Sequence, residues 1–232
     1  MTELLFPAPP VPTVPVQGQT GRIPLRRIFC VGRNYEAHAK EMGAVVDREA
    51  PFYFTKAAAH YVASGSTVAY PAGTSNYHYE MELVAVIGAP AFRVPVERAL
   101  DCVFGYACGL DMTRRDLQQA AKDQRRPWDL AKDTEQSAVM SEIAPASAIG
   151  HPRAGRIELR LNGDVKQSSD LSLMIHGLPE IVAHLSTFYA LQPGDAIYTG
   201  TPEGVGPVKP GDALTGEIAG VGTIALTIGH PL

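Results

Sequence analysis

Long apolar runs and blocks of like charge are both missing from this 232-residue sequence. No uninterrupted apolar stretch reaches the roughly 18–20 residues that a membrane-spanning helix needs. The 20 basic and 24 acidic residues are spread along the chain, so the clustered basic face of a nucleic-acid-binding protein is absent. No basic segment precedes an apolar stretch at the N-terminus, as it would in a secretory signal. We therefore expect a cytoplasmic protein that binds neither membranes nor nucleic acids.

Cysteine is scarce as well. Cys30, Cys102 and Cys108 are an odd number, each stands among apolar neighbours, and their spacing fits no zinc site. The expectation is three buried free thiols in a reducing compartment, rather than disulfides or a redox pair.

Proline, in contrast, is concentrated at the start of the chain, with six prolines in the first 24 residues. Such a stretch can be neither a helix nor a central strand. Residues 1–25 are therefore predicted to form an extended arm that lies on the surface or across a partner. Residues 26–232 contain no linker and no internal repeat, so they are predicted to form one domain.

Hydrophobic patterning predicts a β-rich α+β domain with a few short helices. Strands are expected at 28–31, 79–87, 103–110 and 157–161, and helices at 35–42, 114–122 and 179–191. Asn162-Gly163 predicts a type I′ hairpin turn, and Thr113 with Asp116 predicts a capping box for the second helix. The apolar face of the third helix is expected to include Phe188 and Tyr189.

Two glutamates, Glu80 and Glu82, stand directly before the apolar run 83–87. Residues i and i+2 of a strand point to the same face, about 6–7 Å apart. Two such anions beside a core repel each other and lose hydration, and a hard cation with oxygen ligands would compensate them. A solvated strand end explains the spacing equally well.

Asp111 follows another apolar strand, where a buried carboxylate is costly unless it has a function. Together with the two glutamates it could supply three oxygen ligands and leave other coordination positions to water or substrate. Such an open site is typical of catalytic Mg²⁺ or Mn²⁺. A simple helix N-cap is the alternative for Asp111.

A second candidate constellation is His38 with Glu41, neighbours on one face of a predicted helix. The glutamate can orient the imidazole, so the pair could be a general base that activates water. A solvated helix face is the alternative. Lys132 and Arg115 are candidate anchors for substrate anions, although either could be an ordinary surface residue. The glycine-rich segment 200–207 lets backbone approach a ligand, but it lacks the ending of a phosphate-binding loop.

Five ordered motifs resemble the fumarylacetoacetate hydrolase family, from about residue 28 to residue 228. The motifs are Val31-Gly32-Arg33-Asn34-Tyr35 followed by His38 and Glu41, then Glu80-Met81-Glu82-Leu83, Leu110-Asp111-Met112-Thr113, Leu130-Ala131-Lys132, and the segment 198–207.

This resemblance implies a mixed β-sandwich-like roll, usually a homodimer, with Mg²⁺ or Mn²⁺ on Glu80, Glu82 and Asp111. It also implies that the His38–Glu41 pair activates water and sits on a lid that orders over the ligand, and that Lys132 is catalytic. The residues that it implies for binding substrate are Arg33, Arg115, Gln118 and Thr201. Two departures from the family pattern, Tyr79 and Ala57, do not touch the metal ligands.

The implied activity is hydrolysis of the carbon–carbon bond of an acylpyruvate. The proline-rich start and the order of motifs are similar to bacterial fumarylpyruvate hydrolases of aromatic catabolism. Alternatives are oxaloacetate decarboxylation, decarboxylation or isomerisation of hydroxy-diene-dioates, and a non-catalytic metal-stabilised binding protein. Retention of both His38 and Glu41 argues against the last. A carboxylate at the acyl end of the substrate would require a cation, for which Arg33, Arg115 and Lys56 are the candidates.

Overall fold

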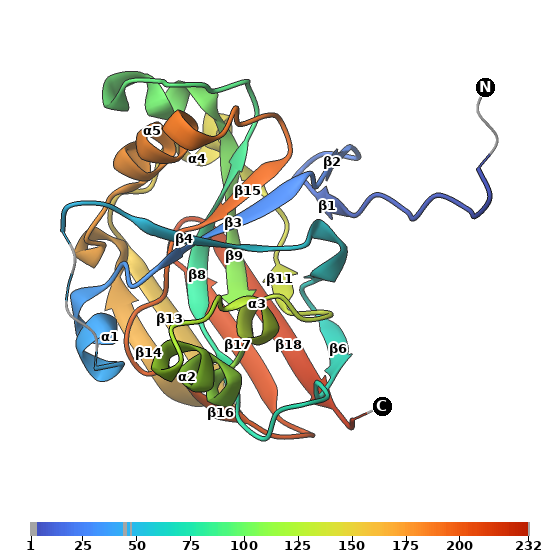
Figure 1. Ribbon diagram of the computed structural model, residues 1–232. Helices are drawn as coiled ribbons and strands as arrows, with labels where there is room; N and C mark the ends of the chain where they lie inside the picture. The colour runs from blue at the N-terminus through green and yellow to red at the C-terminus, as the bar shows by residue number, and fades with distance from the viewer. Residues whose placement is uncertain (1–3, 44–45, 47, 232) are drawn as a thin grey trace.

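The computed structural model describes residues 4–43, 46 and 48–231, and two packed β-sheets form the centre of this part (Figure 1). The prediction of a β-rich α+β fold with few, short helices is confirmed. No described helix combines the length and the apolar character needed to cross a bilayer. The α-helices are α1 (Glu36–Glu41), α2 (Arg115–Asp123), α3 (Asp129–Lys132), α4 (Ala146–Ile149) and α5 (Leu178–Phe188), and the 3₁₀ helices are η1 (Ala58–His60), η2 (Val96–Cys102) and η3 (Leu171–Leu173).

The larger sheet has the strand order β4-β3-β15-β8-β9-β11-β5, with β12 paired to β9. Strand β15 is parallel to β3 and antiparallel to β8, although it comes much later in the chain. The strands of this sheet are β3 (Arg27–Gly32), β4 (Phe52–Lys56), β5 (Tyr61–Ala63), β8 (Met81–Ile87), β9 (Val103–Asp111), β11 (Ala138–Met140), β12 (Ala144–Pro145) and β15 (Asp195–Tyr198).

The second sheet has the order β14-β13-β17-β18-β6 and lies across the larger sheet. Its strands are β6 (Ser66–Ala69), β13 (Arg156–Leu161), β14 (Asp164–Asp170), β17 (Ala213–Ile218) and β18 (Gly222–Gly229). Two small sheets complete the fold: β10-β7-β16, formed by β7 (Tyr77–Tyr79), β10 (Thr113–Arg114) and β16 (Gly206–Val208), and the hairpin of β1 (Thr13–Pro15) and β2 (Arg22–Pro24).

Strand β8 is buried on both faces, which explains the unbroken apolar run 83–87. Leu83 and alternate residues pack into the core between the two sheets. Val84 and Val86 face the other way, into a second cluster that includes Val14 of the N-terminal hairpin. With a hydrophobic layer on each side, the strand and the glutamate that it carries near its start, Glu82, are held in one register.

The predicted N-terminal arm has two parts. Residues 13–24 form the β1–β2 hairpin, in which Pro15 and Pro24 end the strands, and Val14 is buried. Residues 4–12 extend away from the body (Figure 1). Residues 1–3 lie outside the described residues.

Local expectations had mixed outcomes. The Asn162-Gly163 turn is confirmed, because both residues have positive φ (52° and 91°) between paired strands. The three cysteines are buried and free, as expected. The capping box is wrong: Arg114 is the N-cap of α2, and the Asp116 side chain instead accepts hydrogen bonds from Thr74 and Ser75 in the preceding loop.

The predicted apolar face of the third helix is wrong at its end. Helix α5 ends at Phe188, whose side chain is exposed, and Tyr189 has already left helical geometry. The Tyr189 ring instead lies 5.0 Å from that of Phe29 on β3. Long-range packing of this ring therefore outweighs the helical periodicity.

Candidate active site

The predicted acidic triple converges where β8 begins and β9 ends. Antiparallel pairing of these strands sets Glu82 opposite Gly109, and the Asp111 N–H donates to the Glu80 carbonyl at 2.9 Å. One carboxylate oxygen from each of Glu80, Glu82 and Asp111 lies within 4.8 Å of the other two, and all three side chains are buried. The structure thus brings together the three residues that the sequence predicted as metal ligands.

Two of these carboxylates have buried cationic partners. The Lys132 Nζ donates to Glu80 Oε2 at 2.7 Å and to Asp111 Oδ2 at 2.6 Å. Arg115 donates to the other oxygen of Glu80, and Lys56 Nζ lies 2.9 Å from Asp111 Oδ1. Burial alone would raise the pKa of Glu80, but Lys132 and Arg115 outweigh it and hold that pKa well below its usual range. Glu80 is therefore ionised at neutral pH.

Glu82 is the exception in the cluster. Its Oε2 accepts a hydrogen bond from the Gly200 N–H at 2.7 Å, yet it forms no ion pair with any described residue. Burial, followed by repulsion from Asp111 and Glu80, raises its pKa well above the usual value. Three convergent oxygen donors with one carboxylate lacking a counter-charge fit a hard divalent cation such as Mg²⁺ or Mn²⁺.

The predicted His38–Glu41 pair forms on helix α1. His38 Nδ1 lies 3.1 Å from Glu41 Oε2, and the same carboxylate accepts from the Gly204 N–H at 3.1 Å. The hydrogen bond with His38 is the main cause of the lowered pKa of Glu41. Because Nδ1 is engaged, Nε2 is the ring nitrogen left for a reactant. Helix α1 is seated on the body here, so the opening of a lid stays a prediction; residues 44, 45 and 47, which follow it, lie outside the described residues.

An inner pocket of about 20 Å³ connects these groups. It is lined by Glu80, Glu82, His38 and Lys132, together with all four predicted substrate-binding residues: Arg33, Arg115, Gln118 and Thr201. Asp111 and Glu41 do not line it. Asp111 instead contacts the lining residue Lys132, and Glu41 contacts the lining residue His38. The residues that the sequence singled out therefore share one place, and their individual roles remain predictions.

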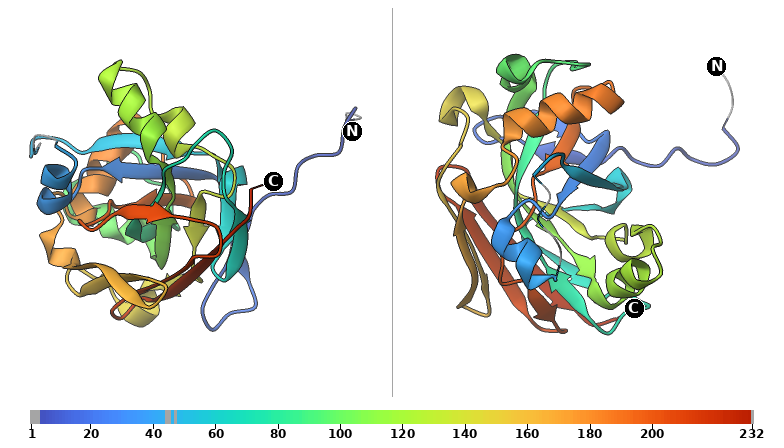
Figure 2. Two further views of the ribbon diagram at one scale, coloured as in Figure 1. Left: turned by 90° about the horizontal axis from the view of Figure 1, so that it is seen from below. Right: turned by 60° about the vertical axis from the view of Figure 1, so that its left-hand side comes forward.

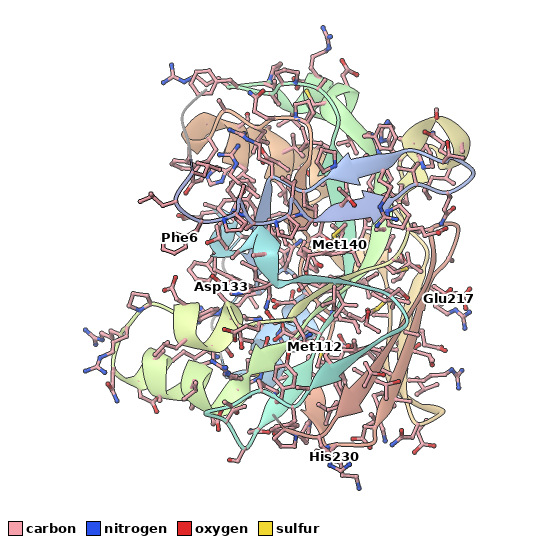
Figure 3. The ribbon with its side chains drawn as sticks, turned by 90° about the vertical axis from the view of Figure 1, so that its right-hand side faces the viewer. Phe6, Met112, Asp133, Met140, Glu217 and His230 are labelled. Carbon is pink, nitrogen blue, oxygen red and sulfur yellow. The ribbon has the colours of Figure 1, made fainter. Side chains whose placement is uncertain are left out.

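The inner pocket shares its rim with a larger hollow of about 800 Å³. This hollow lies between β4 and the lobe formed by α2 and α3, which stands beside the sheets (Figure 2). Met112, the residue after Asp111, lies in the interior next to this lobe, and Asp133 follows α3 (Figure 3). Lys122 and Trp128 belong to both cavities.

Sequence reasoning missed Lys122 and Trp128. Lys122 is seven residues after Arg115 and four after Gln118, a spacing that places all three on one face of α2. This spacing is the feature of the sequence that could have identified Lys122 as a residue of the site. No local pattern identifies Trp128, because its place depends on the packing of the α2–α3 lobe.

The expectation that Lys56 could bind the acyl end of a substrate is wrong. Its side chain is buried behind the acidic triple, where Nζ donates to the Met112 carbonyl at 3.0 Å and to Ser137 Oγ at 2.9 Å. A third hydrogen bond, to the Lys132 carbonyl, uses its last N–H donor, and its ammonium also forms the ion pair with Asp111. Lys56 instead orients a carboxylate of the cluster.

His78, on strand β7, supports Arg115. The Arg115 Nε–H donates to His78 Nδ1 at 3.4 Å, and His78 Nε2 lies 2.8 Å from Asn76 Oδ1. Burial, and then the positive charge of Arg115, lower the pKa of His78 to about 4. The imidazole is therefore neutral near pH 7 and can accept this hydrogen bond.

Comparison with known proteins agrees with this geometry. Residues 27–229 match the family model described as fumarylacetoacetate (FAA) hydrolase C-terminal. The chain belongs to the fumarylacetoacetate hydrolase family. Within this family, it is 55% identical over 190 residues to the fumarylpyruvate hydrolase of Ralstonia sp, covering 81% of this chain and 98% of that protein. It is 40% identical over 206 residues to the human mitochondrial oxaloacetate tautomerase FAHD1, covering 89% of this chain and 93% of that protein.

A solved structure of the family shows the same fold. The crystal structure of fumarylpyruvate hydrolase from Pseudomonas aeruginosa, in complex with Mn²⁺ and pyruvate, has a TM-score of 0.95 and 45% sequence identity. The match covers 98% of this chain and 100% of that chain. The mixed β-sandwich-like roll expected from the family resemblance is thereby confirmed.

Proposed function

We propose that this protein is a metal-dependent hydrolase that cleaves the carbon–carbon bond of an acylpyruvate, converting fumarylpyruvate to fumarate and pyruvate. The observation that carries this proposal is that His38, paired with Glu41, lines the same pocket as Glu80 and Glu82 of the acidic triple. Similarity to two fumarylpyruvate hydrolases, one of them in complex with Mn²⁺ and pyruvate, supports the substrate.

Glu80, Glu82 and Asp111 would hold the Mg²⁺ or Mn²⁺ ion. When bound, the ion supplies Lewis acidity to the oxo-acid end of the substrate and stabilises negative charge there. Arg115 and Gln118, joined by a hydrogen bond of 2.6 Å, present polar groups to the same pocket and suit an oxo group or a carboxylate.

The His38–Glu41 pair performs the hydrolytic step. The free ring nitrogen of His38 takes a proton from a water molecule, which then attacks the acyl carbonyl. Glu41, kept ionised by its lowered pKa, stabilises the imidazolium that forms. The bond from the carbonyl carbon to the neighbouring methylene carbon then breaks, its electron pair leaves with the pyruvate fragment as an enolate, and a proton completes pyruvate.

Lys132 holds the acidic triple in place in this structure. Its three N–H donors are used by Glu80, Asp111 and the Thr113 hydroxyl, the last at 2.8 Å. The ammonium lies on the pocket wall, so we infer that its charge favours the anionic fragment as carbon–carbon cleavage proceeds.

Oxaloacetate chemistry is a second candidate, favoured by similarity to human oxaloacetate tautomerase FAHD1. Decarboxylation of oxaloacetate needs stabilisation of an enolate but no attacking water, whereas tautomerisation transfers a proton between C3 and the C2 oxygen. Hydrolysis and decarboxylation are therefore separable by removing the base that activates water.

The test is turnover of fumarylpyruvate, acetylpyruvate and oxaloacetate, with and without Mg²⁺ or Mn²⁺, by the wild type and by His38→Gln. We expect metal-dependent hydrolysis in the wild type and a loss of about 10²–10⁴-fold in the variant, the usual share of general base catalysis. Metal affinity and any decarboxylation of oxaloacetate should persist in the variant. Hydrolysis by His38→Gln at close to the wild-type rate would contradict the assigned role.

We also infer that the protein acts in aromatic catabolism in the cytoplasm and works as a homodimer. The dimer is supported by the projecting segment 4–12, whose Leu5 and Phe6 side chains are 93% and 81% exposed in the single chain. Light scattering of the full chain tests this inference, and a monomer at micromolar concentration would contradict it.

A further inference from the structure

Two cations lie close to the only tryptophan of the chain. The Arg33 guanidinium lies 5.6 Å from the centroid of the Trp128 ring, and Lys122 Nζ lies 5.5 Å from the same centroid. Neither side chain has a hydrogen-bond or ion-pair partner among residues 4–43, 46 and 48–231. Cations on an indole are stabilised by its quadrupole, but two close cations without an anion repel each other. The arrangement therefore suits an anionic ligand.

Arg33, Lys122 and Trp128 lie where a substrate bound at the acidic triple would leave the inner pocket. All three lie on the rim shared by the inner pocket and the outer hollow. The inner pocket, at about 20 Å³, has room for little more than one small group. A substrate whose oxo-acid end enters the inner pocket must therefore extend its acyl end across this rim.

The surroundings favour negative charge in the ligand. Five basic and only two acidic side chains line the outer hollow. Burial, and then the charges of Arg115 and Arg33, lower the pKa of Lys122 to about 8, with Lys132 acting in the same direction and Glu80 against it. An anion between Lys122 and Arg33 would relieve this repulsion.

The backbone at Arg33 supports the same conclusion. Its φ of 59° is in the left-handed region, which is uncommon for a residue other than glycine. Such conformations concentrate at ligand-binding sites, where the surrounding fold maintains them. Here the next residue, Asn34, is fixed by its side-chain hydrogen bonds to the Thr199 and His176 carbonyls at 2.8 and 3.0 Å, which holds the backbone beside Arg33 in place.

We propose that Lys122, Arg33 and the indole of Trp128 form a subsite for a carboxylate at the acyl end of the substrate, so that the enzyme selects acylpyruvates with a second carboxylate. This inference rests on the proposed hydrolase function and adds the substrate specificity of that hydrolase. Lys122 and Arg33 hold the carboxylate, and the flat face of Trp128 packs against the unsaturated acyl chain.

The first experiment measures kcat and KM of the metal-loaded enzyme for fumarylpyruvate and for acetylpyruvate, which lacks the second carboxylate. We expect Lys122→Met to lower kcat/KM for fumarylpyruvate about ten- to a hundredfold, mostly through KM, since a charge-assisted hydrogen bond is lost. Acetylpyruvate should change less than about threefold. Lys122→Arg should restore the preference. Lys209→Met, which removes an exposed lysine that lines neither cavity, is the matched control.

Equal losses on both substrates in Lys122→Met would overturn the subsite, because they would show a general effect on the site. If the wild type with Mn²⁺ or Mg²⁺ hydrolyses neither acylpyruvate, the proposed function fails instead. A second measurement tests the subsite in that case as well.

Trp128 makes this second measurement direct, since its fluorescence comes from the subsite itself. Titration of the Mg²⁺-loaded protein with fumarate should give a saturable change in emission. In Lys122→Met the apparent Kd should rise about tenfold or more, and in Lys209→Met it should stay at the wild-type value. The same fumarate affinity in the wild type and in Lys122→Met would overturn the proposal whatever the catalytic activity.

Discussion

Replacing Glu82 by glutamine should stabilise the metal-free protein and should remove the stabilisation that Mg²⁺ gives to the wild type. Glu82 forms no ion pair within the described part of the chain, and carboxylate oxygens of Glu80 and Asp111 lie within 4.8 Å. At that distance, two unit charges repel each other by about 3.5 kcal/mol at an effective dielectric constant of 20. Glutamine keeps the shape and can still accept the Gly200 hydrogen bond, but it carries no charge.

The size of the effect has an upper limit. The protein can avoid the repulsion by keeping Glu82 protonated. The ordinary pKa of a glutamate is 4.5, so pH 7 lies 2.5 pH units above it, and protonation at pH 7 costs about 3.4 kcal/mol. We therefore expect Glu82→Gln to raise the free energy of unfolding of the metal-free protein by about 1–3 kcal/mol. Each kcal/mol corresponds to about 2–4 °C in Tm for a chain of this size. Because the pKa of Glu82 is raised, the advantage should shrink as the pH falls toward 4.5.

Thermal unfolding followed by circular dichroism, in EDTA and in excess Mg²⁺, measures both effects. At a concentration of 100 Kd, a ligand stabilises the folded state by about 2.7 kcal/mol; this gain should appear in the wild type and disappear in Glu82→Gln. Glu97→Gln removes an exposed carboxylate elsewhere and serves as the control. A metal-free Glu82→Gln protein less stable than the wild type would refute the electrostatic argument, and an undiminished Mg²⁺ effect would refute the metal site.

Two further expectations concern pH and packing. Lys122, with a pKa of about 8, loses its charge as the pH rises through that value. The preference for fumarylpyruvate over acetylpyruvate should therefore fall between pH 7 and pH 9. Measuring kcat/KM for both substrates at both pH values checks this, and a constant preference would contradict it. Gly109→Ala would place a Cβ 2.4 Å from Val84 Cγ2 and 2.7 Å from Tyr198 Cε1. We expect a cost of about 1–3 kcal/mol, measurable as a lower urea midpoint, and an unchanged midpoint would refute the packing argument.

The parts of the site that the sequence predicted are those encoded by local periodicity. Glu80 and Glu82 alternate along an extended segment beside an unbroken apolar run, and that run is buried on both faces. His38 and Glu41 are three residues apart on a helix, and they do pair. In each case the geometry follows from the repeat of a single element.

Other parts depend on which elements pack together, and the sequence alone could not supply them. Lys56 was taken for a substrate anchor, but the packing of distant segments places its ammonium against Asp111, 55 residues away along the chain. Asp116 fits a capping box by spacing, but the loop at Thr74 and Ser75 takes its carboxylate. Tertiary contacts decided both outcomes.

The position of β15 has a consequence for how the chain can fold. The strand lies between β3 and β8, and among the described residues no direct pairing joins those two strands. Until residues 195–198 are available, the larger sheet therefore exists as two separate pieces, each with an open inner edge. Gly200, which binds Glu82, follows the same strand. A nascent or truncated chain that ends near residue 190 would hold the acidic triple but would expose two strand edges able to pair with other chains.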